Sequence, residues 1–369
     1  MKWTGRFAIL LALAFLPGCG AGNTNGISGS AHNVFVTLPV QNGIAAYRVS
    51  SSGGLTTVIG GPFVAGNSPA SICIHPSGKF AYVANQGEND ISLLDIDSST
   101  GGLSEVKPRT PTGVNPSSLV MNSAGTTLFA ANQSSNTISV YSINSSSGAL
   151  TEISGSPFLS NPAPFALLIS PSGKFLYVAN PNQNVPAISA YTVGSGGALT
   201  PISGSPFAVG HGPFSMAVDP GEHFLYVANA IDNTLSVLAI NAATGGLSTV
   251  AGSPFATGTH PLSVALALSG TYLYVANEGS GNISVFSLSN GVPTQITNSP
   301  FGVTSAPTYI TLDVSGTFLW EADQTAKSIS EYPITATTGS AGTDIVGSLS
   351  SSANTTTFTS PPDVISSQH

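Results

Sequence analysis

The segment HPSGKFAYVAN, residues 75–85, recurs along the chain with small changes, as SPSGKFLYVAN at 170–180 and DPGEHFLYVAN at 219–229. Alignment on the aromatic residue before "VAN" gives seven related positions: Phe35, Tyr82, Phe129, Tyr177, Tyr226, Tyr274 and Trp320. The steps between them are 47, 47, 48, 49, 48 and 46 residues. A period of this length is typical of the blades of a β-propeller.

Each unit has the pattern of four antiparallel strands. A short apolar run such as SICI (71–74) is followed by a Gly- or Pro-containing turn and then by the FAYVAN-type segment. A third segment alternates with period two, as in ISVYSI (138–143), and a more polar fourth segment usually ends in GSPF. Because polarity rises along each unit, we expect the first strand at the centre and the fourth at the outer edge. The sequence therefore predicts an all-β fold, a seven-bladed propeller of four-stranded antiparallel blades. The coils of a β-helix, the alternative repeat fold, are shorter than these units.

The chain ends predict how the ring is closed. The first unit begins at HNVFVTL (32–38), which corresponds to a second strand, and SPPDVIS (360–366) resembles the first-strand segment SPASICI (68–74). We expect residues 362–366 to pair with the first blade, because an open ring would expose two strand edges. The propeller would then span residues 31–369, with no room for a second domain.

The N-terminal residues predict export. Lys2 and Arg6 precede an apolar run at 7–16, which is too short to cross a bilayer and fits a signal peptide over residues 1–18. The sequence LPGC (16–19) resembles a bacterial lipoprotein cleavage box with Cys19 as the acylated residue. Residues 19–30 would form a flexible tether in the cell envelope, at the periplasmic or outer-membrane face. Secretion without a lipid is the alternative, and Cys73, in an apolar strand, is expected to be a buried, inert thiol.

Charge is scarce. The chain has 8 basic and 16 acidic residues, and removal of Lys2 and Arg6 leaves 8 − 2 = 6 basic residues and a balance of −10. No basic patch exists, so nucleic acid is excluded as a partner. Nucleophile-elbow, haem and Walker motifs are absent, and the six histidines lack ligand spacing. We therefore expect no cofactor and no metal.

The chain resembles the YVTN-repeat and lactonase-type propellers, which include the bacterial 6-phosphogluconolactonases. PSGKFAYVAN (76–85), PSGKFLYVAN (171–180), the ISVY segments and the TGGL segments carry the resemblance. It implies a seven-bladed propeller and suggests lactone hydrolysis. The chain departs from the phosphogluconolactonase pattern, because no histidine follows the prolines that precede the first strands. Only Arg48 and Arg109 remain in the mature chain, in a third-strand segment and after a fourth strand. The bidentate arginine clamp that an anionic substrate needs is therefore not visible.

Candidate catalytic residues lie where the units differ. The loops that lead into the first strands of blades five and six carry His211 and His260, and Glu278 begins the loop after the second strand of blade six. In a propeller these loops share one rim, so the three side chains are candidates for one site. Imidazole titrates near neutrality and is suited to general-base hydrolysis. The alternative is that they are solvated loop residues, like other charged residues placed in comparable loops: Glu88, Asp90, Asp232, Glu321, Asp323 and Lys327.

An amide recurs at the end of the second strand: Asn85, Asn132, Asn180, Asn229 and Asn277. These residues suggest either a ligand collar or, the interpretation we favour, side chains that bind their own loop backbone.

Two functions follow from these observations. The first, favoured by the missing arginines and the tether, is a lipid-anchored scaffold that binds a protein, glycan or small molecule and contacts the membrane only through its anchor. The second is a lactonase that opens a small, uncharged lactone, with His260 as general base and Glu278 orienting it.

Overall fold

A computed structural model of the chain describes residues 32–49, 55–182, 186–297, 299–303, 306–312, 316, 318–323, 325–326, 328–335, 348–349, 354–357 and 365–367. The expected signal peptide, Cys19 and the tether lie outside these residues. Within them, no helix is long and apolar enough to cross a membrane.

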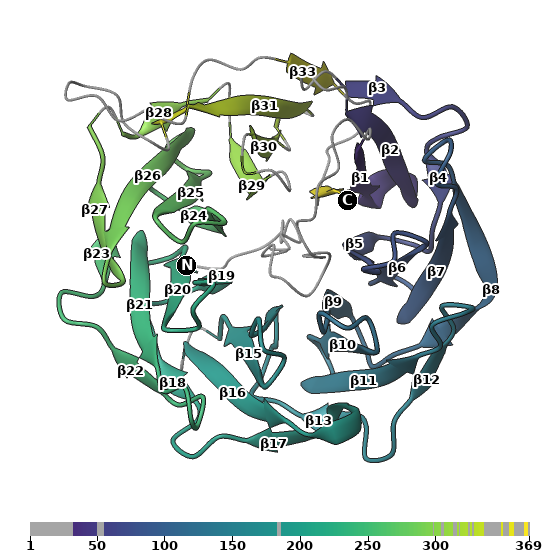
Figure 1. Ribbon diagram of the computed structural model, residues 1–369, viewed down its shortest axis with the longest axis horizontal. Coiled ribbons are helices and arrows are strands. Elements are labelled where there is room, and N and C mark those ends of the chain that lie inside the picture. Colours follow the sequence, from purple (N-terminus) through teal and green to yellow (C-terminus); the bar gives the residue numbers. More distant parts are fainter. Residues whose placement is uncertain are drawn as a thin grey trace, which may run out of the picture.

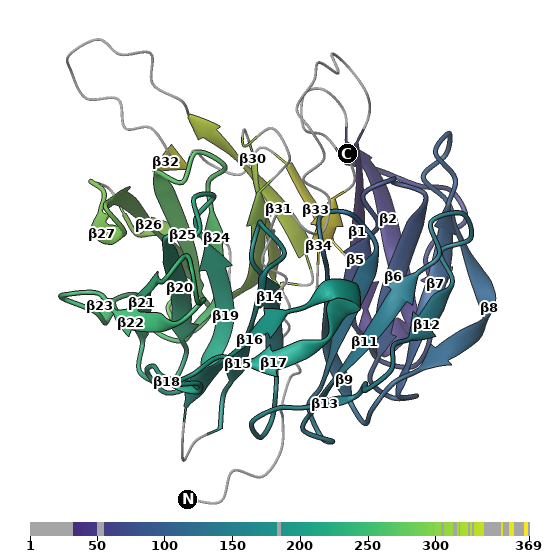
Figure 2. The ribbon, with the colours of Figure 1, turned by 60° about the horizontal axis from the view of Figure 1, so that its bottom comes forward.

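The architecture is a seven-bladed β-propeller, as the repeats predict. Seven antiparallel sheets surround a central axis, and the chain passes from one sheet to the next in order (Figure 1). The tilted view shows the blades standing side by side around the ring (Figure 2). Short strands near the axis and longer third strands further out give each blade the same layout.

The strands of each blade are as follows. Blade one contains β1 (His32–Leu38), β2 (Gly43–Val49), β3 (Leu55–Thr57) and β4 (Phe63–Val64), with the 3-10 helix η1 (Pro39–Gln41) after β1. Blade two contains β5 (Pro69–Ile74), β6 (Phe80–Asn85), β7 (Asp90–Ile96) and β8 (Leu103–Pro111). Blade three contains β9 (Pro116–Met121), β10 (Thr127–Asn132), β11 (Thr137–Ile143), β12 (Leu150–Glu152) and β13 (Phe158–Leu159). Blade four contains β14 (Ala166–Ile169), β15 (Phe175–Asn180), β16 (Ala187–Val193), η2 (Ser195–Gly197), β17 (Leu199–Pro201) and β18 (Phe207–Ala208).

Blade five contains β19 (Pro213–Val218), β20 (Phe224–Asn229), β21 (Thr234–Ile240), β22 (Leu247–Thr249) and β23 (Phe255–Ala256). Blade six contains β24 (Pro261–Leu266), β25 (Tyr272–Asn277), β26 (Asn282–Ser289), β27 (Val292–Gln295) and β28 (Phe301–Gly302). Blade seven contains β29 (Pro307–Leu312), β30 (Phe318–Asp323), β31 (Ser328–Thr335), β32 (Ser348–Leu349) and β33 (Asn354–Thr357), and β34 (Ile365–Ser367) joins blade one.

The fourth strand is usually divided into two short pieces. In blade three, for example, β12 and β13 both pair with β11, and β13 begins at Phe158, the last residue of the GSPF segment. The serine before the proline accepts a hydrogen bond from the third strand, since Val140 N donates to Ser156 Oγ at 2.9 Å. Gly61 replaces this serine in blade one and Lys107 replaces it in blade two, and of these two blades only blade two has a continuous fourth strand, β8.

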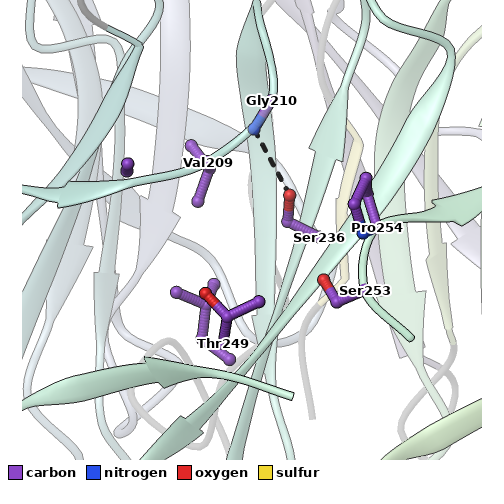
Figure 3. A pocket seen from close by; sticks show the side chains of 8 residues that line it. Val209, Gly210, Ser236, Thr249, Ser253 and Pro254 are labelled. Carbon is purple, nitrogen blue, oxygen red and sulfur yellow. Dashed lines mark hydrogen bonds between the residues drawn. The ribbon is translucent and has the colours of Figure 1, made fainter. Parts of the chain in front are cut away.

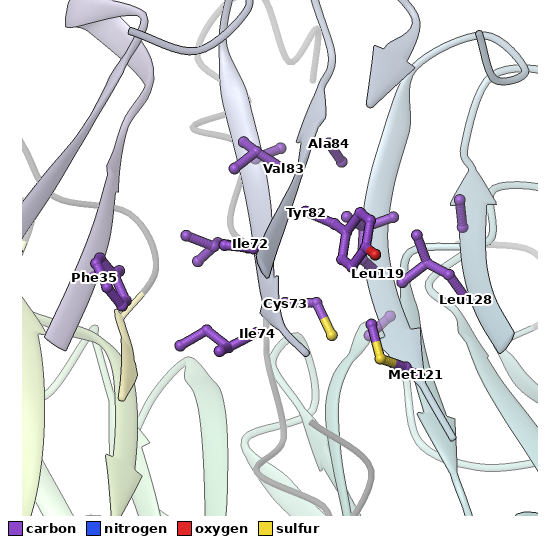
Figure 4. Packing of buried hydrophobic residues seen from close by; sticks show 14 of the residues in the cluster. Phe35, Ile72, Cys73, Ile74, Tyr82, Val83, Ala84, Leu119, Met121 and Leu128 are labelled. Atoms are coloured by element: carbon purple, nitrogen blue, oxygen red, sulfur yellow. The ribbon is translucent and has the colours of Figure 1, made fainter. Parts of the chain in front are cut away.

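Alternating side chains of the inner strands fill the spaces between blades. In blade two, Ile72, Ile74 and Val83 point toward blade one, whereas Cys73 and Tyr82 point toward Leu119 and Met121 of blade three (Figure 4). Both inner strands of this blade are buried throughout, which is why their sequences are apolar on both faces. Cys73 is fully buried, as expected, but it is disulfide-bonded rather than the free thiol that the sequence predicted.

The C-terminal strand β34 pairs with the first blade. Ile365 lies opposite Val36 and Ser367 opposite Val34, in antiparallel register. The pairing involves the segment that the sequence indicated, with the strand placed at Ile365–Ser367.

Candidate functional site

The rim that carries the candidate residues is formed by two loops of each blade. The lead-in loop precedes the first strand, and the exit loop follows the second strand. In blade six the two loops are joined by backbone hydrogen bonds, from Glu278 N to His260 O at 3.0 Å and from Gly279 N to Thr259 O at 3.0 Å. In blade five Ile231 N donates to His211 O at 3.1 Å. The fold therefore places His260 directly beside Glu278.

His260 occupies a position that is left-handed in several blades. The residue before the first-strand proline has positive φ at Ser68, Asn115, Ala163, Gly212 and His260, with values of 52°, 62°, 57°, 70° and 54°. In blades two, three, four and six the backbone N–H of this residue donates to the side-chain oxygen of an asparagine in the preceding blade. The four acceptors are Asn42, Asn89, Asn136 and Asn233. The backbone holds this conformation with quite different side chains. The side chain at position 260 is therefore available for chemistry.

The His260 imidazole forms a hydrogen bond with the Glu278 carboxylate. Nδ1 lies 2.8 Å from Oε2, and the two side chains are 42% and 35% exposed. With the proton on Nδ1 donated to Glu278, Nε2 carries a lone pair, and no residue in the described part of the chain bonds it. This is the arrangement of a histidine base oriented by a carboxylate.

His211 belongs to a second pair rather than to the first. Its Nδ1 lies 3.1 and 3.0 Å from the two carboxylate oxygens of Asp232, and its backbone N–H donates to the same carboxylate at 2.7 Å. The backbone N–H of His211, followed by its ring, lowers the pKa of Asp232. Across the described residues, no hydrogen bond or ion pair joins His211 to His260 or Glu278. The structure thus brings together two of the three candidates, and Asp232, which the sequence placed among solvated loop charges, is the partner of the third.

The two pairs are nevertheless neighbours on the rim. The exit loop of blade five runs from Asp232, which binds His211, to Asn233, whose Oδ1 accepts the His260 N–H at 2.7 Å. Two histidine–carboxylate pairs therefore lie on consecutive blades, connected by a single loop.

The recurring asparagines are structural. Asn85 and Asn277 are fully buried, and each accepts a backbone N–H of its lead-in loop, from Gly66 at 3.0 Å and from Gly258 at 3.1 Å. Each also donates to a third-strand serine, Asn277 to Ser284 at 2.9 Å. In these two blades the amides fix the rim loops, as the favoured sequence interpretation expected, whereas the buried Oδ1 atoms of Asn132 and Asn229 have no hydrogen-bond partner among the described residues.

Two carboxylic acids of blade seven were placed wrongly by the sequence. Glu321 and Asp323 were assigned to a rim loop, but both lie in β30 and are fully buried. Asp323 takes the asparagine position and accepts the backbone N–H groups of Ala306 and Ala326 at 2.7 and 2.6 Å. Burial, followed by the charge of Asp323, raises the pKa of Glu321 to about 8, while the hydroxyls of Ser330 and Tyr332 act in the opposite direction. The alignment of the repeats could have predicted that Glu321 is buried in the second strand, because Glu321 takes the position of Val83 and Val178 in other blades.

A family model described as "Lactonase, 7-bladed beta-propeller" matches residues 51–165, 158–264 and 253–345. The chain belongs to the seven-bladed lactonase propeller family. No curated protein matches it in sequence.

Solved structures of lactonase-type propellers share its fold at low sequence identity. A protein of Bacteroides fragilis, provisionally assigned as a 6-phosphogluconolactonase, has a TM-score of 0.77 at 19% identity and covers 94% of this chain and 100% of its own. The periplasmic gluconolactonase of Pseudomonas aeruginosa has a TM-score of 0.72 at 16% identity and covers 92% of this chain and 99% of its own. At these identities the likeness establishes the fold.

In this lactonase-family propeller, Arg109 forms ion pairs with carboxylates of the protein itself. It lies within β8, not after the fourth strand as the sequence suggested. Its Nε donates to Glu105 at 2.6 Å, its Nη1 to Glu88, and its Nη2 to the carbonyl of Ala65 at 3.2 Å. This arginine is therefore committed to the structure of blade two. Among the described residues, no cluster of three or more His, Cys, Asp or Glu side chains could hold a metal ion.

Proposed function

We propose that this protein is a hydrolase that opens small, uncharged lactones, with His260 as general base and Glu278 as the residue that orients it. The observation that carries the proposal is the 2.8 Å contact between His260 Nδ1 and Glu278 Oε2 on an accessible rim. Membership of the lactonase propeller family supports the same reaction class, as does the name of the gluconolactonase that shares the fold.

The chemistry requires one proton to be moved twice. His260 Nε2 removes a proton from a water molecule, whose oxygen attacks the lactone carbonyl to give a tetrahedral intermediate. Collapse of the intermediate breaks the bond between the carbonyl carbon and the ring oxygen, and the imidazolium returns its proton to that oxygen. The product is the open hydroxy acid. Glu278 holds the ring in the required tautomer and stabilises the imidazolium.

The charges around the site favour a neutral substrate. Asp232 and Glu278 lie on this sector of the rim, and Arg109 is bound to Glu105 and Glu88 in blade two. A phosphorylated lactone would meet these carboxylates, and no arginine lies in the described rim loops of blades five and six to hold it. Assay of a panel of neutral lactones alongside 6-phosphogluconolactone tests the proposal. Hydrolysis should be confined to, or much faster with, the neutral compounds.

A binding scaffold is the second candidate, and exposed apolar residues of the same rim favour it. Val40 in η1, Val114 in the lead-in loop of blade three and Ile231 in the exit loop of blade five are 75%, 52% and 51% exposed. Side chains of this kind mark surfaces that contact a partner when they gather together. If the protein hydrolyses no lactone, binding of a partner would be the proposed function of this rim.

We further propose that the protein works outside the cytoplasm, on the strength of the signal-peptide pattern at 1–18 and the lipobox at Cys19. The chain has two cysteines, Cys19 and Cys73, so lipid on the Cys19 sulfur and a disulfide at Cys73 exclude each other within one chain. The lipid-anchored form that we propose is therefore one without the Cys73 disulfide.

A further inference from the structure

One position of the third strand usually carries an aromatic ring. It lies opposite the residue before the second-strand aromatic, and it is filled by Tyr47, Tyr141, Tyr191, Phe286 and Tyr332. In blades three and four the ring reaches the connection from the preceding blade. Tyr141 Oη donates to the carbonyl of Pro111 at 2.7 Å, and Tyr191 Oη donates to the carbonyl of Leu159 at 3.1 Å. The tyrosine thus closes the outer gap between two blades.

Blade five lacks this ring. Leu238 occupies the position, opposite Leu225, and Ala208 takes the place of Leu159 at the end of the preceding blade. A cavity of about 280 Å³ remains there, lined by Ala208, Val209, Leu238, Thr249 and Pro254 among others (Figure 3). The cavity therefore marks the place of the missing phenol ring.

Blade two also has a leucine at this position, Leu94, which lies opposite Glu105. There, Arg109 occupies the gap, bonding Glu105 and the Ala65 carbonyl of the preceding connection. Blade five has no charged side chain among the residues that line its cavity.

Two of the three polar side chains that line the blade five cavity, Ser236 and Ser253, already accept hydrogen bonds, and Thr249 is the third. Ser236 Oγ accepts from Gly210 N at 3.3 Å, drawn in Figure 3, and from Asn229 Nδ2 at 2.8 Å. Ser253 Oγ accepts from Val237 N at 2.9 Å. The cavity offers a ligand an apolar wall, the Thr249 hydroxyl and the Ala208 carbonyl. The Ala208 carbonyl is at the position that receives a tyrosine hydroxyl in blades three and four.

We propose that this cavity binds a small phenol, with its ring against Leu238 and its hydroxyl donating to the Ala208 carbonyl. A volume of 280 Å³ accommodates a phenol with a short para substituent. The site is distinct from the His260–Glu278 pair and does not depend on the proposed hydrolysis.

Calorimetric titration of the full chain with p-cresol, with toluene as the matched probe lacking a hydroxyl, tests the proposal. Wild type should bind one equivalent of p-cresol, and toluene should bind at least ten-fold more weakly. Leu238→Tyr should fill the cavity with the chain's own phenol and abolish binding. Tyr191→Leu should open the equivalent space in blade four and raise the stoichiometry to two.

The proposal is overturned if wild type does not bind p-cresol, or if Leu238→Tyr binds it as tightly as wild type. Equal affinity for toluene would overturn the assignment of a phenol. Where Leu238→Tyr fails to fold, Leu238→Phe, which copies blade six, is expected to lose binding in the same way. Retained binding in that variant would contradict the site.

Discussion

The Nδ1 atom of His260 lies 2.8 Å from Glu278 Oε2, and the backbone N–H of Glu278 donates to the carbonyl of His260 at 3.0 Å. The two residues are thus joined twice, once through the backbone and once through the side chains. Asn233 of the preceding blade fixes the His260 N–H from the other side at 2.7 Å. Because the propeller itself fixes this geometry, the pair is preorganised without a ligand.

Replacement of Glu321 by valine should stabilise the protein in a pH-dependent way. Burial raises the pKa of Glu321 from 4.5 to about 8 in the folded chain, so the folded state holds its proton more tightly than the unfolded state. The stabilisation that proton binding by Glu321 adds to the free energy of unfolding is fully present below pH 4.5. It is lost as the pH rises to about 8, at about 1.4 kcal/mol per pH unit. The advantage of Glu321→Val over wild type should therefore grow across that window. Denaturant unfolding at several pH values measures it.

Asp323→Asn provides the matched comparison for that prediction. It restores the asparagine found in blades two to six and removes the second cause of the raised Glu321 pKa. The pH dependence should shift toward lower pH and should persist. A stability difference between wild type and Glu321→Val that is constant from pH 5 to 8 would contradict the assignment.

Deletion of residues 365–369 should destabilise the whole ring. The deletion removes β34, whose residues pair with Val34, Phe35 and Val36 of the first blade. These three residues are buried, so the loss would uncover their strand edge. We expect a lower thermal midpoint, while deletion of residues 368–369 alone, which spares β34, should leave it unchanged. Equal melting of the two truncated chains would argue against a closing role for β34.

The processed N-terminus should be Cys19 carrying acyl groups. The lipobox LPGC predicts cleavage before this residue, and two or more acyl chains would hold the protein stably on a membrane. Intact mass of the protein isolated from membranes of its native host measures the modification. A lipid-free chain in the medium, starting at another residue, would refute the anchor.

The sequence predicted the fold more fully than the site, for physical reasons. A blade repeats its strand pattern because each copy must pack on both neighbours, so the seven aromatic positions from Phe35 to Trp320 suffice to count the blades. The His260–Glu278 contact followed from loops known to share a rim. The pairing of His211 with Asp232 did not, because it depends on which way an exposed side chain turns.

Residues that depart from the repeat were harder to interpret. Glu321 looked like a surface charge because carboxylates are rarely buried, although its strand position indicated the interior. The cavity beside Leu238 depends on the absence of a ring that other blades possess, which becomes visible only when Tyr141 and Tyr191 are seen bonding the neighbouring connection.

The central claim, that His260 and Glu278 open neutral lactones, is tested most directly by comparing lactone hydrolysis by wild type, His260→Asn and Glu278→Gln. Asn115 occupies the equivalent left-handed position in blade three, so His260→Asn should preserve the backbone and the thermal midpoint while removing the base. We predict that kcat/KM for a neutral lactone falls by about 10²–10⁴-fold in His260→Asn, the usual contribution of general-base catalysis, and to a smaller extent in Glu278→Gln. Rates in the variants equal to wild type, or no hydrolysis above background by wild type, would contradict the account.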